Sequence, residues 1–483
     1  MTPAMGRRAV APAGRRLRPA LALGGALALA GALFPASAGA HGISGKADLP
    51  IPSWLFAWGA ALVLVVSFVA LGALWRKPLL DRLPERVLLG YPRWLEIPCG
   101  AVGIAIFVLF VYAGFAGNQD PNRNFDPTFF FVIFWVGLPF ASVLFGDVFR
   151  AFNPWRAAGR AAGWLVGAVR SRPVAHRPYP EWLGRWPAVA GILSYAWVEL
   201  VYTGRTKAQA LAIIGLIYAG LMLAAIATWG SQVWTERGDG FSVYFGLFAR
   251  LSPLHWQDGE LRRRAIGVGV THLDLVPGTV PMLAAMIGST SFDGLGQTSV
   301  WTNVEPHIQD LFSNLGLGQN AALELAYSVG LVVMVGLIGG LYRLGIEGMR
   351  TVDHQHGTDE LATRFVHSLV PIALAYLVAH YFSLLLFQGQ AMGYLVSDPL
   401  GKGSNLFGTA HARVDLNLIS TTWIWYVQVA ALVVGHAAGL TFAHDRALVI
   451  YDRVRAATRS QYWMLAVMVG FTSLGLWLLS ARS

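Results

Sequence analysis

Four ionisable side chains in apolar parts of the sequence could act together in chemistry. His272 and Asp274 lie two residues apart in one apolar stretch, and His380 and His436 lie in two others. Burying such groups in a membrane is costly, so they usually face the protein interior and are often functional. Imidazole nitrogen and carboxylate oxygen suit Zn²⁺ and other transition metals. The four residues predict a divalent metal site whose bound water, made more acidic by the metal, attacks an ester or phosphotriester.

The backbone around His272 is predicted to be irregular. Pro277 has no N–H to donate to the carbonyl of Leu273, and Pro281 leaves the carbonyl of Pro277 free. Residues two apart on an intact helix point to different faces, so His272 and Asp274 can bind one ion only if the helix unwinds locally. Broken membrane helices are tolerated where they are buried in protein or line a cavity. The prolines therefore favour a site here.

Further polar side chains are expected around these four residues. They are His367, His444, Asp293, Gln388 and Gln390. His380 lies nearer the outer end of its stretch and could instead belong to an external mouth with Asp293, His411 and Asp415. A plainer alternative is that each histidine only hydrogen-bonds across helices.

The elements that must position these residues are membrane helices. The chain has 483 residues, of which 55% are hydrophobic and only 13% charged, whereas soluble domains carry about 25% charged residues. This composition argues against a soluble enzyme, a nucleic-acid-binding protein and a disordered scaffold. The single cysteine, Cys99, excludes an intramolecular disulfide. The sequence predicts an all-α polytopic transmembrane helix bundle that forms one membrane domain over residues 41–483.

Ten apolar stretches beyond residue 50 are predicted to cross about 30 Å of hydrocarbon. They are 54–75, 97–115, 129–144, 187–202, 208–229, 265–287, 321–341, 365–387, 419–442 and 462–479.

The basic residues predict how these spans are oriented. Of the 36 Lys and Arg residues, 24 fall in the segments that ten spans place in the cytoplasm, seven fall outside and five lie in the N-terminal signal region. Positive charge accumulates on the cytoplasmic side of membrane proteins. The distribution therefore predicts a protein of the cytoplasmic (inner) membrane with both mature termini outside. The net charge of +10 is a topology signal rather than a nucleic-acid-binding patch.

The N-terminal segment is predicted to be a signal peptide, residues 1–40. Five arginines precede the apolar stretch 19–34, and Ala38-Gly39-Ala40 has the pattern of a cleavage site. An uncleaved first helix is the alternative. Cleavage after Ala40 would make His41 the N-terminus, where its α-amine and imidazole could chelate copper.

Four segments resemble a family of integral membrane proteins of high-GC bacteria known as fenitrothion hydrolases. They are AHGISGKADLPIP at the mature start, THLDLVPGTVPMLAAMIGSTSFDG (271–294), HSLVPIALAYLVAHYFSLLLFQGQ (367–390) and VQVAALVVGHAAGLTFAHDRAL (427–448). The resemblance implies an organophosphate hydrolase that cleaves the P–O–aryl bond of a phosphotriester and releases a nitrophenol. It also implies a small apolar substrate reached from the lipid bilayer. The resemblance carries no catalytic motif with it, so the roles of the histidines and of Asp274 are inferred from the residues alone.

Two other functions fit the same residues. Buried ionisable groups beside broken helices are also typical of a transporter or a metal-handling permease. The third reading is a non-catalytic assembly partner of a respiratory or copper enzyme, with His41 as a metal ligand. The sequence names no protein partner.

Overall fold

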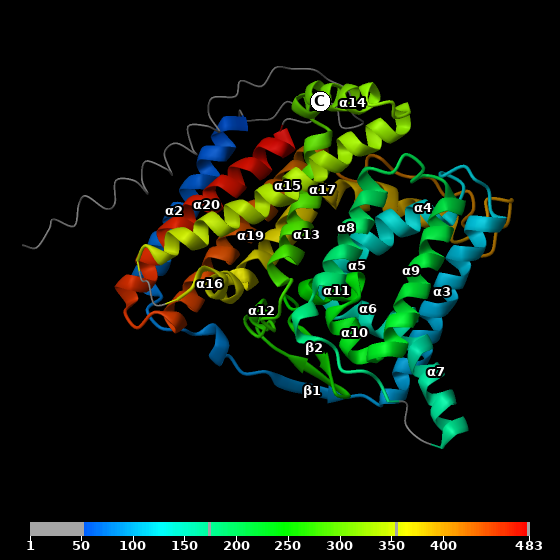
Figure 1. Cartoon of the computed structure of the whole chain (residues 1–483), viewed down its shortest axis with the longest axis horizontal. Coiled ribbons are helices and arrows are strands. Elements are labelled where there is room, and N and C mark those ends of the chain that lie inside the picture. The colour runs from blue at the N-terminus through cyan, green and yellow to red at the C-terminus, as the bar shows by residue number, and fades with distance from the viewer. Residues whose placement is uncertain (1–52, 172–174, 353–355, 481–483) are drawn as a thin grey trace, which may run out of the picture.

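The computed structural model describes residues 53–171, 175–352 and 356–480, so the predicted signal peptide and His41 lie outside the described residues. Within these residues the chain forms a helix bundle with three short strands, which confirms the predicted all-α class (Figure 1). Seven of the described helices are long and apolar enough to cross a membrane. The chain is therefore a multi-pass membrane protein whose apolar helices suit contact with a lipid bilayer.

Seven of the ten predicted spans correspond to these candidate membrane helices. The helices are Arg93–Ala116, Phe125–Phe145, Ala208–Trp229, Gln319–Arg350, Thr358–Leu395, Thr421–Ile450 and Val454–Ser480. The predicted span 54–75 is the helix α2 (Ser53–Leu74), and the predicted span 187–202 is the 15-residue helix α8 (Trp186–Leu200).

The predicted span 265–287 is not one helix. A short helix, α12 (Val268–Thr271), is followed by irregular backbone, and the long helix α13 begins only at Thr279 and ends at Gly296. Gly267 and Gly278 flank this segment with φ angles of +79° and +83°, a backbone conformation that glycine adopts readily. The break that the prolines predict is present, but it lies before the apolar helix rather than within it.

One part of the bundle, which we call the histidine half, consists of α2 and the elements from α12 onward (Figure 1). Its long helices are α13, α15 (Gln319–Arg350), α17 (Val370–Gln388), α19 (Thr421–Ile450) and α20 (Val454–Ser480). Its shorter helices are α14 (Ser299–Asn314), α16 (Thr358–Phe365), η6 (Val366–Leu369), η7 (Gly389–Ala391) and α18 (Met392–Leu395). The most extensive helix contact is between α17 and α19.

Small residues allow this close packing. A Cβ added at Gly435 of α19 would lie 2.3 Å from the Cβ of Ala375 in α17. A Cβ at Gly439 would lie 2.9 Å from the carbonyl oxygen of Ser368. Glycine at such positions lets two membrane helices approach until their backbones almost touch.

The other part, the aromatic half, is the continuous stretch from α3 to α11. Its long helices are α3 (Glu96–Ala116), α8 and α9 (Ala208–Trp229), and one span is built from α4 (Phe125–Thr128), the π-helix η4 (Phe129–Gly137) and α5 (Leu138–Phe145). Its shorter helices are α6 (Val148–Phe152), α7 (Pro154–Arg170), η5 (Glu181–Leu183), α10 (Ser231–Arg237) and α11 (Gly240–Ala249). The two halves meet where α8 packs on α13 and where η4 and α11 pack on α17.

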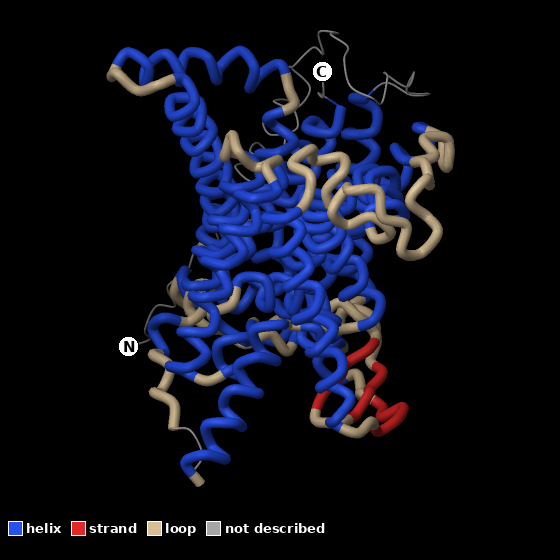
Figure 2. Tube along the Cα trace, turned by 90° about the vertical axis from the view of Figure 1, so that its right-hand side faces the viewer, coloured by secondary structure: helices blue, strands red, loops and turns tan. Residues whose placement is uncertain are grey.

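A small sheet lies where the chain passes between the halves. Strand β1 (Arg86–Gly90) lies between α2 and α3, and β2 (Leu254–Gln257) and β3 (Glu260–Arg263) lie between α11 and α12. The strands are antiparallel in the order β1-β3-β2. The short helices η2 (Leu80–Arg82) and η3 (Arg93–Leu95) flank β1. Figure 2 shows the sheet at one end of the bundle, the sheet end, opposite the end that carries α14.

Candidate functional site

His272 and Asp274 lie at the sheet end, in the irregular segment between α12 and α13, and both are exposed. The guanidinium of Arg250 lies 3.7 Å from the Asp274 carboxylate and donates a hydrogen bond of 2.8 Å to the His272 carbonyl oxygen. The near partner of this carboxylate is therefore an arginine. The structure does not place either residue at the membrane depth that the predicted span implies.

Three other histidines are buried, and each bonds to a backbone carbonyl. His436 in α19 donates from Nδ1 to the carbonyl of Leu432 at 2.7 Å, within its own helix. His367 bonds to the carbonyl of Arg364 at 3.0 Å, and His444 to that of Trp75 at 3.0 Å. The last of these bonds links α19 to the end of α2. These contacts stabilise helix ends and helix packing.

The predicted metal ligands lie at three separate places. His272 and Asp274 are at the sheet end, His436 is inside the histidine half, and His380 is on α17. Among the described residues, no three His, Cys, Asp or Glu side chains are placed to hold a metal ion together. These side chains do not fit a metal as they are arranged, so no step of the proposal below uses one.

Of the polar residues expected nearby, the two glutamines at the end of α17 differ in their contacts. Gln388 is exposed. Gln390 donates to the backbone carbonyl of Asp415 at 3.0 Å and accepts from its backbone N–H at 2.9 Å, which fastens the following loop to the end of α17.

A close side-chain pair joins α17 to α13. Nε2 of His380 lies 2.7 Å from Oδ2 of Asp293, and the two side chains are only 9% and 22% exposed. The hydroxyl of Tyr381 donates to the same carboxylate, and Glu199 of α8 lies within electrostatic range of it. We call these four residues the acid–histidine group. It lies where the two halves meet.

A small cavity of about 20 Å³ borders His380. Ser291, Thr290 and Gly294 of α13 line it together with Tyr376 of α17 and residues of α19 and α20. The Oγ of Ser291 is buried and has no hydrogen-bond partner among the described residues. A cavity of this size admits one water molecule if polar groups are present to bind it. The geometry thus sets a water-sized space beside a histidine that a carboxylate orients.

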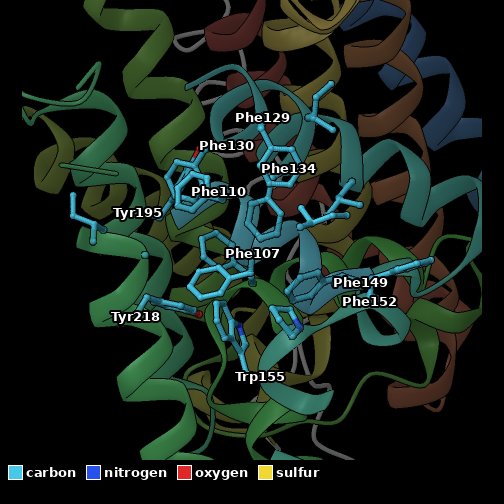
Figure 3. A pocket seen from close by; sticks show the side chains of 18 of the residues that line it. Phe107, Phe110, Phe129, Phe130, Phe134, Phe149, Phe152, Trp155, Tyr195 and Tyr218 are labelled. Atoms are coloured by element: carbon cyan, nitrogen blue, oxygen red, sulfur yellow. The ribbon is translucent and has the colours of Figure 1, made fainter. Parts of the chain in front are cut away.

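A much larger cavity of about 370 Å³, the aromatic chamber, lies in the aromatic half (Figure 3). Eleven aromatic residues line it: Phe107, Phe110, Phe129, Phe130, Phe134, Phe149, Phe152, Trp155, Tyr195, Tyr218 and Phe241. They come from α3, η4, α6, α7, α8, α9 and α11. The chamber exists because α3 packs on α9, α6 and α7, and not extensively on η4 or α8.

The π-helix and one buried carboxylate shape the chamber. Phe129, Phe130 and Phe134 of η4 face it, and π-helical turns often mark functional sites. Tyr218 donates from its hydroxyl to Asp239 at 2.6 Å, and Asn153 donates to the same carboxylate at 3.0 Å. Asp239 therefore ties α9 and the start of α7 to the start of α11.

Tyr195 connects the chamber to the acid–histidine group. Its ring lines the chamber, and it lies within electrostatic range of Glu199 and Asp293. The sequence analysis did not identify the chamber. Its one visible signal is the run Phe129-Phe130-Phe131 with Phe134, which resembles any apolar span in composition.

Fold and site together define a multi-pass membrane protein with a buried carboxylate–histidine pair and a separate aromatic cavity. Comparison of the chain with protein-family models, with curated proteins and with solved structures returns no match. The resemblance to fenitrothion hydrolases therefore remains a prediction from the sequence.

Proposed function

We propose that this protein is a membrane-embedded hydrolase of small apolar phosphotriesters such as fenitrothion, with His380 as its general base. The observation that carries the proposal is the 2.7 Å contact of His380 with Asp293 beside a water-sized cavity. The sequence resemblance supplies the reaction class, and the pair supplies groups able to perform it.

In this proposal His380 and Asp293 have different roles in activating water. Asp293 accepts a hydrogen bond from Nε2 of His380 and so orients the imidazole. Nδ1 lies on the side of Gly294, which also borders the small cavity. Positioned general bases of this kind accelerate reactions by about 10² to 10⁴.

The bonds balance as in any hydrolysis. The water oxygen forms a bond to phosphorus, and one of the two water protons passes to His380. The P–O–aryl bond breaks, and the aryl oxide leaves and recovers the proton to give the nitrophenol. Asp293, whose ionised form the hydrogen bond from Tyr381 stabilises, stabilises the imidazolium that forms between the two steps. The products are the phenol and the phosphodiester.

The basic residues orient the proposed enzyme. Arg82, Arg86 and Arg93 lie beside or within β1 at the sheet end, with Arg262 and Arg263 on β3. Because positive charge marks the cytoplasmic side, we place the sheet end in the cytoplasm and the α14 end outside the inner membrane. A cleaved signal peptide agrees with this orientation.

The test is release of nitrophenol from fenitrothion by membranes of cells that express the protein. We expect Asp293→Asn and His380→Gln to lower the rate by at least about 100-fold, because each removes the oriented base. Asp310→Asn and His307→Gln make the same substitutions at exposed positions of α14 and should leave the rate unchanged. No release above membranes without the protein, or wild-type rates in both pair variants, would overturn the proposal.

The same assay with a chelator tests whether the reaction depends on the metal that the sequence predicts. Because the proposed base is an imidazole, treatment with a strong chelator should leave the rate unchanged. Loss of the rate, with recovery on adding back Zn²⁺, would instead favour the metal-assisted reaction.

Transport is a second candidate, favoured by Asp126 of α4. This residue is fully buried, and neither carboxylate oxygen has a hydrogen-bond partner among the described residues. A Cβ added at Gly114 of α3 would lie 2.8 Å from both Asp126 Oδ2 and the carbonyl oxygen of Ala208. An isolated carboxyl group between two membrane helices is typical of a proton pathway. Flux across sealed proteoliposomes that Asp126→Asn abolishes, without nitrophenol release, would favour transport.

A further inference from the structure

The aromatic chamber is a space of about 370 Å³ that the proposed chemistry does not use. We infer that it binds a small neutral aromatic molecule taken directly from the bilayer. The identification of that molecule as the triester substrate rests on the proposed function. The binding of an aromatic molecule in the chamber does not depend on it.

The size of the chamber suits an aromatic ring with substituents. A cavity of about 150 Å³ lined by apolar side chains binds benzene. The chamber, at about 370 Å³, has more than twice that volume. It also falls within the range of about 300–1,000 Å³ that is usual for small-molecule sites.

The chemistry of the lining favours an uncharged ligand. Of the residues that the structure describes, no Lys, Arg, Asp or Glu lines the chamber. Among its polar groups, the Tyr218 hydroxyl donates to Asp239, and Nε1 of Trp155 and the hydroxyl oxygen of Tyr195 are buried within the wall. The Ser194 hydroxyl also lines the chamber, but it is neutral. A charged ligand would therefore lose its hydration without gaining a partner of opposite charge, which costs several kcal/mol.

The lining favours an aryl group over an acyl chain. Its rings already meet edge to face: Phe134 and Phe241 lie 4.8 Å apart with an interplanar angle of 75°, and Phe107 and Trp155 lie 4.7 Å apart at 80°. Such pairs contribute about 0.5–1.5 kcal/mol beyond the area they bury. Figure 3 shows the aromatic side chains arranged around the space from several directions, so an inserted ring meets both edges and faces.

The chamber is accessible from the side of the bundle. Val102 of α3, which lines it, is 47% exposed, and Ser194 on α8 is exposed as well. Both residues lie well inside their helices rather than at the helix ends. A ligand dissolved in the lipid can therefore reach the chamber without passing through water.

Photolabelling tests this inference separately from hydrolysis. Membranes that contain the full chain are irradiated with 3-trifluoromethyl-3-phenyldiazirine, a small apolar aryl probe, and the labelled residues are mapped by mass spectrometry. We expect labels on the chamber-lining residues of α3, η4 and α8, and we expect fenitrothion to reduce them. Acyl chains are already in large excess in these membranes, so labelling there reports preference for the aryl group.

Two tryptophan variants provide a matched pair. Ser194→Trp places an indole in the chamber and should lower chamber labelling by at least about tenfold, equivalent to a binding loss of 1.4 kcal/mol. Ile213→Trp adds an indole on α9 at an exposed position outside the chamber lining and should have no effect. Competition by fenitrothion on the unmodified protein gives the same information without any variant.

The outcomes separate the two proposals. Chamber labelling that fenitrothion reduces, without nitrophenol release, would support the binding site and reject the hydrolase. Labels confined to outward-facing residues such as Val332 and Val333 of α15 would overturn the binding site. A second result would also overturn it. If fenitrothion leaves the chamber labelling unchanged while lipid added to the detergent-solubilised protein reduces it, the chamber binds an acyl chain instead.

Discussion

The histidine half and the aromatic half both pack some of their helices through glycine, but a chamber of about 370 Å³ lies in the aromatic half. In the histidine half, glycine and alanine bring α17 and α19 into near contact, and the buried histidines bond to backbone carbonyls. In the aromatic half, a π-helix and bulky rings hold α3 and α9 away from η4 and α8, which leaves the chamber. The polar chemistry and the empty space therefore lie in different halves. They come closest at Tyr195 and the acid–histidine group.

This difference shows that a buried ionisable residue need not mark the place where a ligand binds. His436 is fully buried at mid-helix, yet its Nδ1 bonds to a carbonyl of its own helix and its ring packs 6.0 Å from that of Tyr376. Neither of the two cavities described above includes His436 among its lining residues. The volume lies instead where the wall is almost entirely carbon.

The largest expected contrast between the halves comes from removing one phenyl ring in each. Phe471 of α20 is fully buried in the histidine half, and Phe471→Ala should lower the free energy of unfolding by about 3–5 kcal/mol. Phe134 of η4 borders the chamber, so part of its ring has no neighbour to lose. Phe134→Ala should cost less than about half as much. Chemical unfolding in detergent micelles measures both, and equal losses would contradict the contrast.

A smaller effect is expected from adding one methyl group at two helical glycines. Gly435→Ala brings a Cβ within 2.3 Å of Ala375 and 2.8 Å of a backbone oxygen, so it should cost about 1–3 kcal/mol. Gly215→Ala brings a Cβ within 2.9 Å of the Phe110 ring and 3.6 Å of the Phe107 ring, and the Phe110 ring can shift into the chamber. It should cost less than about 0.5 kcal/mol.

Gly220 serves as the reference for this pair, because a Cβ there meets no heavy atom within 4 Å. The unfolding midpoints of the three alanine variants in micelles give the comparison. If Gly215→Ala destabilised the protein as much as Gly435→Ala, the chamber wall would be rigid, and the expected shift of the Phe110 ring into the chamber would be wrong.

The helices were largely predictable from sequence because apolar length is a strong local signal. The stretch 208–229 coincides with α9, where Lys207 precedes the apolar stretch and Gly230 ends it with a φ of +90°. The prediction of one span over 265–287 was wrong. Its composition is as apolar as that of 208–229, but Gly267 and Gly278 turn the backbone. Composition does not record where an apolar segment stops being helical.

The candidate site was predictable only as a set of residue types. Asp293 and His380 both stood out in the sequence, but their pairing depends on how α13 packs against α17. Asp274 also stood out, yet the neighbouring arginine that faces it comes from α11's end, 24 positions earlier in the chain. The chamber had no local signal, because a cavity depends on which helices do not pack together.

The smallest predicted effect concerns the sheet, through which the chain passes between the halves. Glu85, just before β1, lies 3.1 Å from Nδ1 of His255 on β2 and 3.6 Å from Arg264. Burial alone would raise the pKa of Glu85, but His255 and Arg264 outweigh it and hold that pKa below its ordinary value of 4.5. Burial and Arg264 lower the pKa of His255 below 6.5, against the opposing effect of Glu85.

Both shifts make the folded state weaker in acid. A histidine with a lowered pKa resists protonation in the folded protein, so its contribution to stability is complete above pH 6.5 and declines as the pH falls below it. The contribution of Glu85 is complete above pH 4.5 and is lost as the pH falls through its lowered pKa. The sheet should therefore hold the two halves together less firmly at pH 5 than at pH 7.5.

His255→Gln should remove the part of this pH dependence that begins below pH 6.5, an effect of about 1 kcal/mol or less. His307→Gln on α14, far from the sheet, is the matched control, and the unfolding midpoint in micelles across this pH range is the measurement. If both variants keep the wild-type pH profile, the strands join the halves through backbone pairing alone, and the aromatic half depends on its contacts with α13 and α17 to stay in place.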